Sequence, residues 1–122
     1  MEIQSYQDLV VWQKAMDLVV ACYEITNRLP TSETHGLASD IHRKVRQIPS
    51  YIADGHGRGN TAEFLTRLSF AHGSLMALET DFLTTVRLSF FMPKDIEPIL
   101  SRCAEVGRLL NGLMRSLRSK GY

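Results

Sequence analysis

Apolar residues recur with helical spacing along most of the chain. In the first such segment, spacings of four, three, four, three and four residues connect Val11, Ala15, Leu18, Cys22, Ile25 and Leu29. Residues spaced in this way lie on one face of an α-helix. Pro30 disfavours helical geometry in the residue before it. We therefore predict a helix over about residues 8–29.

A second apolar row runs beside the first on the same predicted helix. It consists of Leu9, Trp12, Met16, Val19 and Tyr23. Together the two rows cover about 220° of the helical circumference, which is more than an edge helix of a small monomeric bundle needs to bury. We therefore expect this second row to form an interface between subunits.

The next segment carries a buried stripe of its own, formed by Leu37, Ile41, Val45, Ile48 and Ile52. Thr31 or Ser32 can cap this helix, and Glu33 suits its positive first turn. Pro49 removes the hydrogen bond to the carbonyl of Val45. We predict a helix over about residues 33–55 that is kinked or split near Pro49.

Two further helices follow. Asn60 to Glu63 has the pattern of a capping box and precedes the stripe Phe64, Leu68, Ala71, Leu75, Leu78 and Phe82, which predicts a helix over about residues 61–90. Asp95 can cap a fourth helix over about residues 95–118, with Pro98 in its first turn and Gly121 after its end. The fourth stripe is Ile99, Cys103, Val106, Leu110, Leu113 and Leu117.

Four helices joined by short loops, with no alternating segment, predict an all-α protein. The expected architecture is a single domain over residues 1–122, an antiparallel up-down-up-down four-helix bundle.

Composition narrows the class of protein. Lys and Arg total 14 against 13 Asp and Glu, which gives no overall drive toward nucleic acid or an anionic membrane. Cys22 and Cys103 fall on apolar stripes, where a thiol serves as a small hydrophobic residue. The chain shows neither a signal-peptide pattern nor a long apolar run, so we expect a cytoplasmic protein that does not enter a membrane.

Catalytic and metal-binding patterns are weak. His35, His42, His56 and His72 include no pair spaced to share one metal ion. Glu79 flanks an apolar stripe and could be a general base, but we favour a buried ion pair with Arg43. We therefore expect no metal, no cofactor, no small-molecule substrate and no enzymatic activity.

The segment from Gly55 to Gly59, GHGRG, has a composition that suits a phosphate-binding loop. It lacks the strand before it and the lysine with serine or threonine that such loops use. We interpret Gly55 and Gly57 as left-handed positions that close the second helix, while Arg58 could contact an anion.

Basic side chains offer a further lead. The candidate contacts to nucleic acid are Arg43, Lys44, Arg46, Arg58, Arg108, Arg115 and Arg118. Residues 99–122 hold five basic side chains against one acidic side chain, Glu105. Such residues would bind phosphates without sequence preference and with strong salt dependence. The alternative is a solvated charged surface.

Particular residues also resemble a known family. The opening carries Asp8, Leu9, Trp12, Gln13, Lys14, Ala15, Tyr23 and Pro30. The second helix carries Glu33, Gly36, Leu37, Arg43, Ile48, Ile52, Ala53, Gly55 and Arg58. The third helix carries Phe64, Ala71, Gly73, Ser74, Leu78 and Glu79. As a set, these residues resemble the small bacterial four-helix bundle proteins encoded within intervening sequences of the 23S ribosomal RNA gene.

That family is similar to the accessory variability protein of diversity-generating retroelements. The resemblance implies a homopentamer, and it implies nucleic acid or a reverse transcriptase as partners. The chain departs from the family pattern at Asp40, Lys44, Gln47 and Tyr51, where a polar network could join the second helix to the third. Our first hypothesis is a non-enzymatic oligomeric scaffold, and our second is a nucleic-acid-binding accessory factor.

Overall fold

The computed structural model describes residues 5–120, which form four long helices and two short 3-10 helices. The long helices are α1 (Val10–Thr26), α2 (Leu37–Gly57), α3 (Thr61–Arg87) and α4 (Pro93–Ser119). The short ones are η1 (Tyr6–Asp8) and η2 (Thr31–Glu33). No strand occurs within residues 5–120. The predicted all-α class is confirmed.

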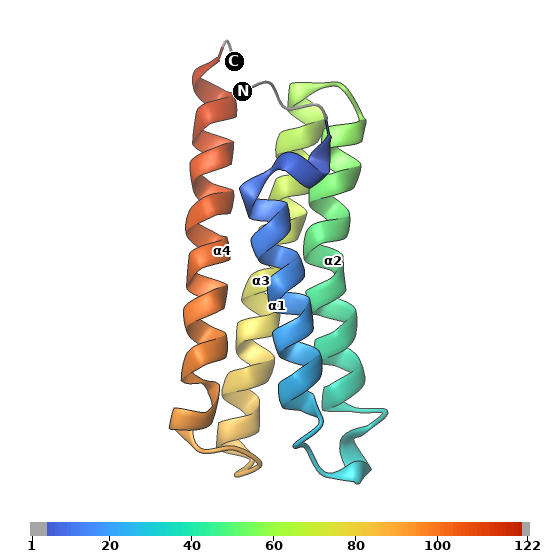
Figure 1. Ribbon diagram of the computed structural model, residues 1–122, viewed down its shortest axis with the longest axis vertical. Coiled ribbons are helices and arrows are strands. Elements are labelled where there is room, and N and C mark those ends of the chain that lie inside the picture. Colours follow the sequence, from blue (N-terminus) through green and yellow to red (C-terminus); the bar gives the residue numbers. More distant parts are fainter. Residues whose placement is uncertain (1–4, 121–122) are drawn as a thin grey trace.

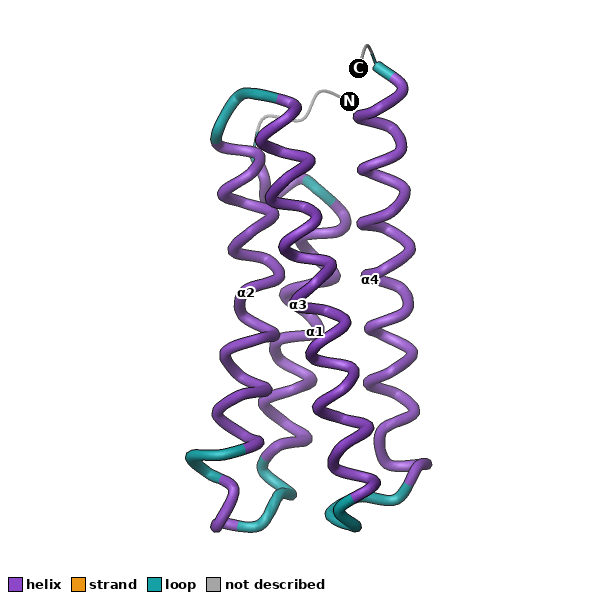
Figure 2. The backbone as a smooth tube through the Cα atoms, turned by 180° about the vertical axis from the view of Figure 1, so that it is seen from behind, coloured by secondary structure: helices purple, strands orange, loops and turns teal. Residues whose placement is uncertain are grey.

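The four helices pack as an antiparallel up-down-up-down bundle (Figure 1). Each helix contacts the next one along the chain, and α1 also contacts α4, which closes the bundle. The α2–α3 pair is the most extensive contact. In both views, α2 and α4 flank the bundle on opposite sides, with α1 and α3 between them (Figure 2). Side chains on α2 and α4 therefore belong to different surfaces.

The predicted stripes fill the core. On α1, Ala15, Leu18 and Cys22 are completely buried, and Cys103 is completely buried on α4. Other fully buried core residues are Ile41, Val45, Ile48, Ile52, Leu68, Ala71, Leu75, Leu78, Phe82, Val106 and Leu110. Leu113 and Leu117 are only partly buried, while Met114 takes a core position at the end of α4. No helix among residues 5–120 combines the length and the apolar content of a bilayer span.

The start of α2 differs from the prediction. The helix begins at Leu37, after the turn η2, and its backbone N–H groups are not capped by Thr31 or Ser32. Instead, the Leu37 N–H donates to Glu33 Oε1 at 3.1 Å. α2 also continues through Pro49 without a break, because the prolyl ring is buried among apolar residues that hold the helix together. The predicted alternative of a split at Pro49 is therefore wrong, while the predicted kink stays a prediction.

In the turn between α2 and α3, the glycines take other roles than predicted. Gly55 and Gly57 lie inside α2, and the left-handed residue is Gly59, with φ of +66°. The Asn60 side chain then caps α3 by accepting from the Glu63 N–H at 3.0 Å, as predicted. GHGRG thus ends one helix and leads into the next.

α4 begins earlier than predicted, at Pro93. Asp95 lies in its first turn and accepts from the Met92 N–H at 2.8 Å. This hydrogen bond, and then the Arg28 side chain, holds the pKa of Asp95 below its usual value. Pro98 consequently falls in the second turn of α4. The predicted stop at Gly121 lies outside the described residues.

Candidate functional site

The exposed face of α1 brings together four of the five predicted interface residues. Trp12, Met16 and Val19 line a groove of about 360 Å³ against α2. Tyr23 continues this face in an adjoining hollow. Met16 is 38% exposed and Val20 is 57% exposed. Val20 was missed by the stripe analysis, although it follows Met16 by one helical turn. We call Trp12, Met16, Val19, Val20 and Tyr23 the α1 face.

Leu9 does not belong to the α1 face. It is the N-cap of α1 and lines a smaller hollow with Val10 and with Leu109 and Leu113 of α4. The first residue of the predicted row therefore lies apart from the other four, because Leu9 precedes the helix and does not follow its periodicity.

The basic residues of α2 have acidic or phenolic partners within the chain. Arg43 pairs with Asp40 at 3.5 Å, and Lys44 pairs with Asp81 at 2.8 Å. Arg46 donates to the Tyr23 hydroxyl at 2.6 Å. The candidate contacts on α2 are thus largely engaged inside the protein.

Arg58 follows α2 and is engaged in the same way, through ion pairs with Asp54 at 3.2 Å and Glu63 at 3.6 Å. These pairs bridge the turn between α2 and α3. They leave Arg58 only partly available for an anion, since both acidic partners would compete with it.

The predicted buried ion pair between Arg43 and Glu79 is not formed. Arg43 lies on the outer face of α2, where its side chain is more than half exposed and pairs with Asp40. Glu79 lies near Cys103 of α4, where its charge helps to raise the pKa of that thiol. Arg43 is therefore turned to the surface of α2, whereas Glu79 is turned toward α4.

The arginines of α4 form a different surface. Arg108, Arg115 and Arg118 are exposed, and none of them takes part in an ion pair within residues 5–120. α4 lies across the bundle from α2. The seven predicted basic contacts therefore do not form one continuous patch.

Three of the four positions predicted to depart from the family pattern line the contact between α2 and α3. Besides the Lys44–Asp81 pair, Gln47 Oε1 accepts from the Ser74 hydroxyl at 3.0 Å. The ring of Tyr51 meets Phe70 edge-on at 5.6 Å. Asp40 instead faces outward and pairs with Arg43. These residues join two helices of one chain, and we call the three contacts the α2–α3 seam.

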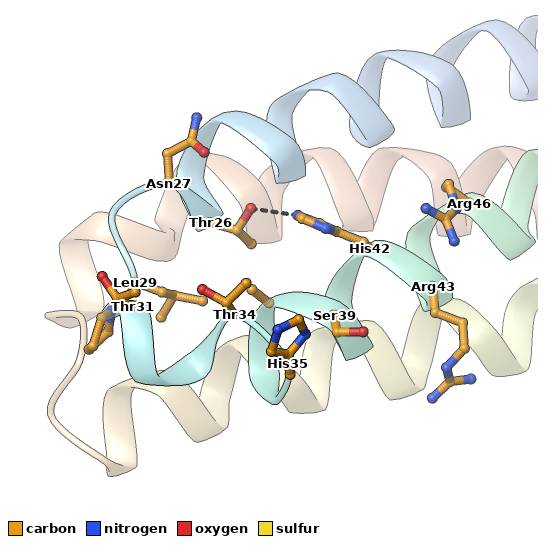
Figure 3. Close-up of a pocket in the computed structure, with 12 residues that line it drawn as sticks. Thr26, Asn27, Leu29, Thr31, Thr34, His35, Ser39, His42, Arg43 and Arg46 are labelled. Atoms are coloured by element: carbon orange, nitrogen blue, oxygen red, sulfur yellow. Dashed lines mark hydrogen bonds between the residues drawn. The ribbon is translucent and has the colours of Figure 1, made fainter.

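A polar pocket of about 510 Å³ lies where α1 ends and α2 begins (Figure 3). It was not predicted, because its residues come from two helices and the loop between them. No acidic side chain lines it. The lining residues are Thr26, Asn27, Leu29, Pro30, Thr31, Thr34, His35, Ala38, Ser39, His42, Arg43 and Arg46.

His42 is held firmly at the edge of this pocket. Its ring stacks on Tyr23, with 3.8 Å between ring centroids and 7° between planes. Its Nε2 lies 2.7 Å from the Thr26 hydroxyl (Figure 3). The same hydroxyl lies 3.1 Å from the Tyr23 carbonyl, and when it donates there it accepts from Nε2–H of His42. Burial and then the Arg46 charge lower the pKa of His42.

The described residues offer little for covalent or metal chemistry. Within residues 5–120, no group of three or more His, Cys, Asp or Glu side chains is arranged to hold a metal ion. Burial raises the pKa of Cys103 to about 12 and also raises the pKa of Cys22. Both thiols are completely buried, so neither is poised to act as a nucleophile.

The fold and its surfaces define an all-α four-helix bundle with an apolar face on α1 and a polar pocket beside it. The chain belongs to the 23S rRNA-intervening sequence protein family, whose model matches residues 7–112.

A solved structure supports the same fold. It is a protein of unknown function from the S23 ribosomal protein family of Bacteroides thetaiotaomicron. The two chains are 19% identical and superpose with a TM-score of 0.80, over 87% of this chain and 96% of the other. Curated proteins gave no match. At this level of identity, the likeness concerns the fold alone.

Proposed function

We propose that this protein is a non-enzymatic helical scaffold that associates with copies of itself through the α1 face. The observation that carries the proposal is the exposure of Met16 and Val20 beside the groove formed with α2. Contiguous exposed apolar side chains are typical of protein interaction sites. Trp12 and Tyr23 add the aromatic side chains that are enriched at interfaces.

The resemblance to the accessory variability protein favours a homopentamer. A closed ring of five copies uses heterologous contacts, so the α1 face would meet a different surface of the neighbouring copy. A dimer would instead place two α1 faces against each other. The two arrangements predict different masses.

Light scattering coupled to size exclusion measures that mass. A pentamer gives five times the chain mass of 13.8 kDa. A dimer would retain the proposal of self-association but exclude a ring of five copies. A monomer at about 100 µM would contradict self-association, because a protein that associates with a Kd of micromolar order, or about 8 kcal/mol of binding free energy, is mostly assembled at that concentration.

Two substitutions test the face itself. Met16→Glu and Val20→Glu each place a charge on an exposed position, so the single chain should still fold while association weakens. Leu88→Glu is the matched control, since Leu88 is about as exposed as Val20 but lies at the end of α3. Circular dichroism confirms folding, and equal dissociation of all three variants would contradict the assignment.

A second candidate function is binding of nucleic acid by α4. Its support is the exposed row Arg108, Arg115 and Arg118, which has no ion-pair partner within residues 5–120. Neutralising the row to glutamine should weaken RNA and DNA binding uniformly across sequences. For duplex DNA, the slope of log affinity against log salt should become shallower by about 0.9 for each phosphate that the variant no longer neutralises.

Arg43→Gln is the control for that experiment, because Arg43 is exposed but pairs with Asp40 on the other side of the bundle. A weakening of binding by Arg43→Gln equal to that of the α4 variant would contradict a site on α4. The absence of any binding at low salt would eliminate this function.

A further inference from the structure

The charged and hydroxyl side chains that line the polar pocket between α1 and α2 suit an anion. Arg43 and Arg46 contribute guanidinium groups, and His35 and His42 contribute imidazoles. Four hydroxyls also line it, from Thr26, Thr31, Thr34 and Ser39. We propose that this pocket binds a small molecule carrying a phosphate monoester. The proposal does not depend on self-association, because no residue of α1 beyond Thr26 is needed to hold the ligand.

The charge of the pocket favours this occupant. No carboxylate lines it, while two arginines do. Arg guanidinium groups form paired, charge-assisted hydrogen bonds with phosphate oxygens. A dianion can therefore use both arginines together, with the hydroxyls of Thr31, Thr34 and Ser39 donating to its remaining oxygens.

The present partners of the two arginines are easily exchanged. The Arg43–Asp40 pair is more than half exposed on both sides, and exposed pairs contribute little to stability. Arg46 contacts only the neutral Tyr23 hydroxyl through Nη1. Its other guanidinium N–H groups can still donate, since the group carries five. Both side chains are long and exposed, so they can turn toward a ligand.

The size of the pocket indicates more than an inorganic ion. A volume of about 510 Å³ falls within the range of small-molecule sites, roughly 300–1,000 Å³. Leu29, Pro30 and Ala38 supply an apolar wall. A phosphate with an attached organic group would occupy both parts.

His42 provides a direct report of occupancy. Its Nε2 lies 2.7 Å from the Thr26 hydroxyl at the edge of the pocket, so a change in the charge of the ring is felt at this contact. The groups that face His42 are Tyr23 and Thr26 from α1 and Arg46 from α2. A bound phosphate adds negative charge beside them and stabilises the cationic ring.

The first experiment uses inorganic phosphate and glycerol 3-phosphate as probes, titrated by calorimetry at constant ionic strength against chloride. We expect saturable binding, tighter for the ester. The Arg43→Gln/Arg46→Gln double variant should bind about tenfold more weakly or worse, because charge-assisted hydrogen bonds are removed. Arg87→Gln/Arg102→Gln is the control and should bind as the wild type does, because both arginines are exposed and neither lines the pocket. Equal binding by both double variants would overturn the proposal.

The second experiment follows the imidazole signals of the four histidines by NMR. Saturating glycerol 3-phosphate should raise the pKa of His42, while His56 and His72, which do not line the pocket, should titrate unchanged. No change at His42, or equal changes at all histidines, would contradict the site. The solution mass of the same samples separates this outcome from the self-association proposal, and the Met16→Glu variant should still bind the probes.

Discussion

At the scale of single residues, close contact between helices depends on Gly55. A Cβ atom added there would lie 2.9 Å from the Arg67 Cβ and 2.9 Å from the Phe64 ring. It would also lie 3.3 Å from the Phe64 backbone oxygen, which cannot move aside as a side chain can. Gly55 is therefore required for packing between α2 and α3, although its backbone is helical.

Gly55→Ala should lower the free energy of unfolding by about 1–3 kcal/mol, the usual cost of overpacking. Gly57→Ala is the matched control, because nothing lies within 4 Å of a Cβ added at Gly57. The control should be neutral or slightly stabilising, since alanine favours helix over glycine. Urea denaturation of both variants provides the measurement, and equal effects would contradict the packing role of Gly55.

His42 should make stability depend on pH near neutrality. Burial, and then Arg46, lowers its pKa in the folded protein below the ordinary value of 6.5. The unfolded chain therefore binds the proton first as the pH falls, and the free energy of unfolding decreases from about pH 6.5 down to the folded pKa. Below the folded pKa of His42, this residue causes no further decrease in the free energy of unfolding.

His42→Gln removes this contribution and should give a flatter profile. The profile is measured from the midpoints of urea denaturation between pH 8 and pH 5.5, in buffers without phosphate. Ordinary carboxylates titrate below this range and therefore do not contribute to the profile. His56→Gln serves as the control, because His56 does not contact Tyr23 or Thr26. Identical profiles for wild type and His42→Gln would contradict the assignment.

The sequence predicts some residues well and others poorly. Buried stripe members such as Leu18 and Val106 follow from periodicity, because burial on a helix repeats every three to four residues. The Thr26–His42 hydrogen bond joins positions 16 residues apart on different helices, so no local pattern contains it. The prediction of the left-handed glycine was wrong for a related reason. GHGRG offers three glycines, and the local sequence does not show that Gly55 packs against Phe64 of α3 while Gly59 takes the positive φ.

At the scale of secondary-structure elements, the α2–α3 seam combines polar and aromatic contacts. Lys44 and Asp81 are mostly buried, with side chains 20% and 13% exposed, and they lie 2.8 Å apart. Gln47–Ser74 and Tyr51–Phe70 continue the row along the same two helices. Three positions that depart from the family pattern thus have partners on α3 in this chain.

A double-mutant cycle should detect coupling between Lys44 and Asp81. Replacing either residue by alanine leaves the other charge partly buried and unpaired, which should cost about 1–3 kcal/mol, and the double variant should lose less than the sum. The exposed Asp40–Arg43 pair is the control and should couple by less than about 0.5 kcal/mol. Equal coupling in the two cycles would contradict the role of burial.

The existence of all four helices was predictable, and so was the start of α3 after the Asn60 cap, but the other helix ends were not. Helix interiors are set by local periodicity, whereas the start of α2 depends on the Glu33 side chain reaching Leu37 after an intervening 3-10 turn. The continuity of α2 at Pro49 likewise depends on burial. The backbone hydrogen bond that proline removes is offset by packing that the local sequence does not reveal.

At the scale of the whole molecule, bundle topology decides which residues meet. Periodicity places a residue on a face of its own helix, but it does not say which neighbour covers that face. The predicted Arg43–Glu79 ion pair is wrong for this reason. For the same reason, the seven candidate basic contacts lie on two separate surfaces, at α2 and at α4. The α1 face came together because its members share one helix. Single-helix sites are thus more predictable than sites between helices.

The two cysteines test whether the bundle unfolds as one unit. Cys22 lies on α1 and Cys103 on α4, both are free, and both are completely buried in one core. Burial also raises both thiol pKa values, so a thiol reagent can react only after the helices separate. We expect both thiols to react at one slow rate that rises with urea as global unfolding does.

Labelling with a thiol reagent, followed by mass spectrometry of the intact chain, provides the measurement. At a reagent concentration where labelling of the unfolded chain is faster than refolding, cooperative unfolding gives chains with either no label or two labels, because Cys22 and Cys103 belong to the same core cluster. The chain unfolded in urea is the control and should label rapidly at both positions. A large population with one label would show that α1 or α4 detaches first. If peptide mapping places that single label on Cys22, α1 detaches first, and association of the α1 face with another copy would contribute to the stability of the fold itself.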